Sequence, residues 1–134
     1  MVITASEILQ KVTSLNRMSD LDPNLFSEEG GYAEVLAKDL RGKLKATQLR
    51  KVFHAIKRID IGLKGEKDDK PVDRTDLNRL LPELAYAKGR GLVPQEFYDL
   101  MKAILSRQRT QTVSDFRRTV EFLTAVLAYH KLYS

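Results

Sequence analysis

Apolar residues recur at intervals of three or four positions along most of this 134-residue chain. That interval places them on one face of an α-helix. No segment of useful length alternates apolar and polar residues, which is the pattern of a half-buried strand. We therefore expect an all-α fold, a compact bundle of about five or six helices. The segments with the helical pattern are 6–18, 32–40, 47–61, 75–88, 94–105 and 115–132.

Glycine, proline and charged residues separate these segments. We expect 19–31 to be a loop, because its proline and its glycine pair break the helical period. The polar, charged connection 64–74 is expected to be a mobile surface loop. Pro82 falls inside a helical pattern and predicts a kink or a restart there. The length of the chain predicts a single helical domain, 1–134.

Polar residues with short side chains precede several of the expected helices. Such side chains can accept a hydrogen bond from a free backbone N–H at a helix N-terminus. Thr47 suits the third helix and Ser114 the last, and either Asp73 or Thr75 suits the fourth. We expect each of these helices to begin directly after its cap.

The last expected helix is apolar on more than one side. A helix of this kind must be buried centrally or shared with another subunit. The pattern does not separate a central core helix in a monomer from a helix that takes part in self-association. Its two apolar stripes are Phe116, Val120, Leu123 and Leu127, and Phe122, Val126, Tyr129 and Tyr133.

Charge changes the interpretation of the third helix. The net charge is +5, and the segment 41–58 holds seven of the 23 Lys and Arg residues and none of the 18 acids. Without carboxylates at helical spacing, these cations have no local ion-pair partners. A solvated surface helix is one explanation of such a run. We favour a second one, in which the helix binds a polyanion.

No catalytic or metal-binding constellation is evident, and we expect a non-enzyme without cofactor or metal. His54 and His130 lie in different helices, and the chain has no cysteine. We expect His54 at the surface and His130 packed at a helix end. The acids of the 64–74 connection lack the regular spacing of a calcium loop.

The sequence also predicts a compartment. No apolar run approaches the roughly 20 residues of a membrane span. The first residues do not show the charged and apolar regions of an export signal. We therefore expect a cytoplasmic protein with no membrane partner.

Two segments carry the candidate binding residues. On the third helix, Arg50 and Arg58 fall on the side away from the apolar stripe, with Lys51 at its margin. In the turn 85–91, Lys88 and Arg90 flank a glycine that allows close backbone approach. Tyr86 could stack on a base, but packing is the favoured role. With no motif for reading bases, we expect sequence-independent backbone contacts.

The two segments together resemble a known family. KATQLRKVFHAIKRI at 45–59 is followed by LPELAYAKGRG at 81–91, in the order and with the character found in the small subunit of type III-A CRISPR effector complexes, the Csm-type small subunit. The first motif departs from the commonest form by a shift of one position at Val52 and Phe53.

The resemblance implies a small, helical, non-catalytic RNA-binding subunit. Several copies would line up with other Csm-type subunits, holding crRNA and paired target RNA in antiviral defence. The matching positions, Thr47, Gln48, Arg50, Lys51, Lys88 and Arg90, would then face RNA. Lys45 and Arg58 join them on the charge argument alone.

Two alternatives come from other classes of function. A helical adaptor could bind an acidic protein, with the last helix carrying the contact. A basic amphipathic protein could bind a membrane surface, which would require Phe53 and Ile56 to stay exposed. We rank the membrane alternative last, because these two residues are expected in the core.

Overall fold

The computed structural model describes residues 3–133, which form helices and no strand, apart from one isolated bridge between Pro71 and Thr112. The expected all-α fold is confirmed, and six of the α-helices have nine residues or more. The elements are α1 (Ala5–Thr13), the 3-10 helix η1 (Met18–Asp20), α2 (Pro23–Ser27), α3 (Tyr32–Leu40), α4 (Ala46–Gly62), α5 (Arg74–Gly89), α6 (Gln95–Ile104) and α7 (Val113–Leu132).

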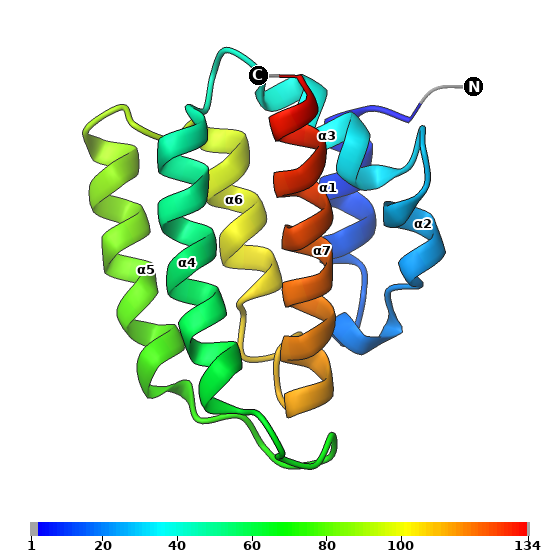
Figure 1. Ribbon diagram of the computed structural model, residues 1–134, viewed down its shortest axis with the longest axis vertical. Coiled ribbons are helices and arrows are strands. Elements are labelled where there is room, and N and C mark those ends of the chain that lie inside the picture. Colours follow the sequence, from blue (N-terminus) through cyan, green and yellow to red (C-terminus); the bar gives the residue numbers. More distant parts are fainter. Residues whose placement is uncertain (1–2, 134) are drawn as a thin grey trace.

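The last helix, α7, lies in the middle of the bundle. It packs against α3, α4, α2 and η1, and Figure 1 shows it between α4 on one side and α2 and α3 on the other. Phe116 and Phe122 are fully buried, and the Phe122 ring meets Phe26 of α2 edge-on with ring centroids 5.4 Å apart. Burial against several neighbours explains why α7 has more than one apolar stripe.

The helix ends differ from the expected ones at two of the three caps. Helix α4 begins at Ala46, with Lys45 at the N-cap position and no side-chain cap, so Thr47 lies inside the first turn. Helix α7 is capped by Thr112 instead of Ser114, in a reciprocal capping box with Asp115. Asp73 caps α5, as expected, by accepting a hydrogen bond from the Thr75 N–H at 2.9 Å.

One expected interruption is wrong, and of the two alternatives predicted at Pro82 the restart is not observed. The segment 19–31 contains part of η1 and all of α2, whose cap is Asp22. Five residues are too few to show a helical period, which is why the sequence pattern missed α2. Helix α5 continues from Arg74 to Gly89 with Pro82 inside it, without a restart.

The connection 64–74 is hydrogen-bonded to the start of α7. The Val72 N–H donates to the Gln111 carbonyl at 3.0 Å, and the Val113 N–H donates to the Lys70 carbonyl at 2.9 Å. The Arg117 guanidinium also bonds the Glu66 carbonyl and the Asp68 carboxylate. The mobility of this connection and the single-domain organisation stay predictions.

Helices α4 and α5 form one edge of the molecule. They are antiparallel neighbours, and α5 packs on α4 and α6 (Figure 1). Of the bulky apolar residues of α4, Ile56 is fully buried and Phe53 is half-buried against the core. This packing turns the other side of α4 toward solvent and toward α5. Within residues 3–133, no helix is long and apolar enough to cross a membrane.

Candidate nucleic-acid interface

The first basic motif lies on the exposed side of α4. Thr47, Lys51 and Arg58 follow one another at helical spacing and are all exposed, as is Arg50 on the adjoining side. Lys45 is exposed at the N-terminus of the helix, where the dipole of the helix favours an anion. The outward direction of these side chains agrees with the amphipathic pattern.

The second basic motif lies at the C-terminus of α5. Arg90 is the C-cap residue and is exposed, whereas Lys88 is half-buried. Gly91 follows with φ +74°, a backbone conformation that favours glycine, and lets the chain turn away from the helix axis. The turn therefore holds Arg90 beside the neighbouring helix α4.

Tyr86 is the main correction at this site. Packing was the favoured role, but the Tyr86 side chain is 67% exposed. The Arg90 guanidinium lies over its ring, 5.8 Å from the centroid. Helical spacing alone could not show this, because α5 has α4 and α6 as neighbours on only part of its circumference.

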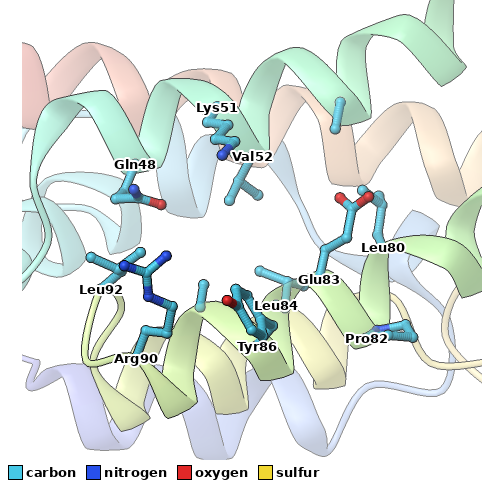
Figure 2. Close-up of a pocket in the computed structure, with 12 residues that line it drawn as sticks. Gln48, Lys51, Val52, Leu80, Pro82, Glu83, Leu84, Tyr86, Arg90 and Leu92 are labelled. Carbon is cyan, nitrogen blue, oxygen red and sulfur yellow. The ribbon is translucent and has the colours of Figure 1, made fainter.

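A groove of about 460 Å³ runs between α4 and α5 and brings the two motifs together (Figure 2). Gln48 and Lys51 contribute from α4, and Arg90 contributes from the end of α5. The remaining candidates, Lys45, Thr47, Arg50, Arg58 and Lys88, do not line this groove. They extend the basic surface along α4 and at the end of α5.

Two further residues line the groove that the sequence had not singled out. Glu83 is an exposed acid in an otherwise basic neighbourhood, and Leu92 is an exposed apolar residue after the turn. Glu83, Tyr86 and Arg90 are spaced by three and four residues along α5, so they share one face of the helix. That spacing is the signal by which Glu83 could have been found, whereas Leu92 lies beyond the end of α5 and has no such signal.

The candidate cations differ from their neighbours in their ion pairs. Lys43 pairs with Asp39 and Glu96, which raise its pKa in that order of importance, and Lys57 pairs with Asp60 at 3.3 Å. Within residues 3–133, in contrast, no carboxylate lies within ion-pair distance of the six candidate cations. These are Lys45, Arg50, Lys51, Arg58, Lys88 and Arg90.

Several other arginines bind the protein's own backbone. Arg109 donates to the carbonyls of Val12 and Thr13, which removes it from the basic surface. Arg118 donates to the carbonyls of Ser19 and Leu21. Their charges hold the N-terminal segments against the end of α6 and the start of α7.

The two histidines lie as expected from the sequence. His54 is exposed on α4, and His130 is buried near the end of α7, where its Nε2 donates to the Leu44 carbonyl at 2.9 Å. In the part of the chain that the structure describes, no three His, Cys, Asp or Glu side chains gather in a way that could hold a metal ion.

Comparison with known families gives one match. The family model described as Csm2 Type III-A matches residues 25–134, a range that contains both basic motifs and the whole α4–α5 groove. No curated protein matches the chain, and no solved structure does. The matched range also includes every candidate RNA-facing residue.

Proposed function

Because the chain belongs to the Csm2 Type III-A family, and is thus a subunit of a type III-A CRISPR effector, we propose that it holds crRNA and paired target RNA. It does so through sequence-independent contacts to the phosphate backbone. It takes no part in catalysis and works in the cytoplasm, beside other Csm-type subunits and further copies of itself.

The observation that carries this proposal is the set of cations without carboxylate partners. Lysine and arginine side chains at a protein surface are usually stabilised by ion pairs with nearby acids. Lys43 and Lys57, which are close to the candidate cations in the sequence, make such pairs. Arg50 and Lys51, consecutive residues of α4, have no such partner within the described residues. Phosphates that lie along α4 would neutralise both.

The arrangement also supports backbone contact over base reading. The cations extend along one side of α4 and around the end of α5, so they can follow a charged strand. Lys45 and Thr47 add the N-terminal turn of α4, where free N–H groups favour a phosphate.

The experiment is a salt titration of RNA binding. We expect the double variant Arg50→Ala, Lys51→Ala to bind single-stranded RNA more weakly and with a lower salt dependence. Each lost phosphate contact reduces the slope of log K against log salt by about 0.7, so two contacts reduce it by about 1.4. Circular dichroism should show an unchanged fold, because both side chains are exposed.

A matched control removes the same charge elsewhere. Lys11 and Arg107 are exposed cations outside α4 and α5, and Lys11→Ala, Arg107→Ala lowers the net charge equally. We expect this variant to keep the native slope. Equal slopes for both double variants would mean that RNA, if bound, does not lie on α4.

The two alternatives have less support. The adaptor hypothesis places the contact on the last helix, but α7 is buried against several neighbours over much of its length. The membrane hypothesis needs Phe53 and Ile56 at the surface, whereas Ile56 is fully buried and Phe53 is half-buried.

A further inference from the structure

We propose that the groove between α4 and α5 receives one unpaired nucleobase of the bound RNA, which stacks on Tyr86. This inference rests on the proposed RNA binding and adds a contact that backbone binding does not require. The ligand is a single-stranded nucleotide, or one turned out of a duplex, whose phosphate lies at the basic end of the groove.

Charge is distributed unevenly along the groove. Gln48 and Arg90 lie at one end, Lys51 lies next to Val52 nearer the middle on α4, and Glu83 lies toward the other end (Figure 2). A phosphate suits the end with the cations and is repelled by the carboxylate. A base carries no charge, so it can extend from that phosphate toward Glu83. A second phosphate in that position would be repelled by the Glu83 carboxylate.

The middle of the groove suits a planar, uncharged ring. Val52 lines it from α4, and Leu84 and Ala87 line it from α5. These aliphatic side chains make an apolar surface, and a volume of about 460 Å³ lies in the range of small-molecule sites. Burial of a base there removes apolar surface from water.

Tyr86 is an aromatic side chain that solvent reaches. At 67% exposure, its ring contributes little to the core. Base–aromatic stacking tolerates any sequence, because every base presents a π face. Arg90 lies over the same ring, which sets a phosphate-binding cation next to the stacking surface.

The test compares RNA with and without bases. A 12-nucleotide single-stranded RNA and an abasic ribose-phosphate strand of equal length are titrated against the full chain at one salt concentration. We expect the base-containing strand to bind about fivefold tighter or more. Tyr86→Ala should bring the ratio of the two affinities close to one, while the salt slope stays native because no cation is lost.

Two variants sharpen the comparison. Tyr86→Phe keeps the aromatic ring, so the ratio of the affinities for base-containing and abasic RNA should stay as in the native chain. Ala55 is the last α4 residue that lines the groove, at the end where α5 contributes Leu80, so Ala55→Phe narrows that end without a change of charge and should bring the affinity ratio closer to one. With 2-aminopurine as the central base, the native chain and Tyr86→Phe should change its fluorescence on binding, and Tyr86→Ala should not.

The outcomes separate this inference from the proposed function. Abasic and base-containing strands that bind equally well to the native chain would overturn the inference and leave backbone binding intact. Failure of both strands to bind would contradict the proposed function itself. If Ala55→Phe weakened association with other subunits and left the affinity ratio unchanged, the groove would be a protein-docking surface and the inference would be wrong.

Discussion

The carboxylate of Asp115 accepts hydrogen bonds from the Arg17 guanidinium at 2.7 Å and from three backbone N–H groups, those of Ser19, Gln111 and Thr112, at 2.9 to 3.1 Å. Its side chain is fully buried. Burial alone would raise the pKa of Asp115, but these hydrogen bonds more than offset that effect and lower the pKa from 3.8 to about 2. One side chain thus joins η1 to the start of α7.

We expect Asp115→Asn to lower the free energy of unfolding at neutral pH by about 3 kcal/mol, because it leaves the Arg17 charge without its partner. The folded pKa lies below the unfolded one, so the contribution of Asp115 is complete above the unfolded value and is lost as pH falls through about 2. Urea denaturation at several pH values measures this.

The difference in the free energy of unfolding between the wild type and Asp115→Asn should therefore decrease by roughly 2 kcal/mol as pH falls from above 3.8 to about 2. A gap independent of pH over that range would contradict the assignment of the lowered pKa to this carboxylate.

At the level of residues, the sequence predicted the direction of a side chain correctly where that direction depends on a single helix. The period of α4 placed Arg50 and Lys51 outward, because both the apolar stripe and the cations lie within a few turns. It failed for contacts between distant segments. Arg17 and Asp115 are 98 positions apart, and no local pattern links them. The Thr112 and Asp115 capping box was the one local signal available there.

At the scale of elements, α5 tolerates a residue that helices usually exclude. Pro82 has no backbone N–H, so its turn lacks the hydrogen bond to the Asn78 carbonyl, four residues earlier. We expect Pro82→Ala to raise the free energy of unfolding by about 1 to 3 kcal/mol. Thermal or urea denaturation measures the change.

Arg79→Ala is the matched control, since Arg79 is exposed on the same helix and its ion pair with Asp76 is exposed too. It should change stability little. A Pro82→Ala variant no more stable than this control would mean that the surroundings of Pro82 already compensate for the missing hydrogen bond.

The period of the apolar residues predicted the long helices but not all of their ends. Tyr32–Leu40 was predicted with the bounds that the structure has. The first helix was expected to reach residue 18, but α1 ends at Thr13 and Met18 begins η1. Met18 is nevertheless buried. The apolar spacing therefore predicted correctly that Met18 packs in the core, and it predicted wrongly that one helix continues as far as Met18.

At the scale of the whole molecule, the core extends beyond the range matched by the family. Ile8, Val12 and Met18 are fully buried although they precede residue 25. The Met18 N–H also donates to the Arg109 carbonyl at 2.8 Å. We propose that the chain unfolds as one domain, with these residues part of its only cooperative unit.

A chain that begins at residue 25 should therefore fail to show a cooperative transition. Each large buried apolar side chain contributes about 1.5 to 3 kcal/mol, and the loss of several approaches the whole stability of a small domain. In the full chain, Ile8→Ala should cost about 2 to 5 kcal/mol. A truncated chain with native circular dichroism and a sharp transition would show that 25–134 is independent.

The central position of α7 also bears on assembly. Its apolar stripes are satisfied within one chain, so they do not by themselves require a second subunit. The cations on α4 and α5 remain at the surface, where RNA would neutralise them. We therefore propose that copies come together along one RNA and not through exchange of α7.

The central claim is that this chain holds RNA inside a type III-A effector. The most direct test is purification of the tagged chain from the cells that encode it, with identification of the proteins and nucleic acid that accompany it. We expect a multi-subunit complex with short, repeat-derived RNA, and loss of that RNA when Arg50 and Lys51 are replaced together with the other four candidate cations, Lys45, Arg58, Lys88 and Arg90. Recovery of the chain alone, or with an acidic protein and no RNA, would contradict the claim.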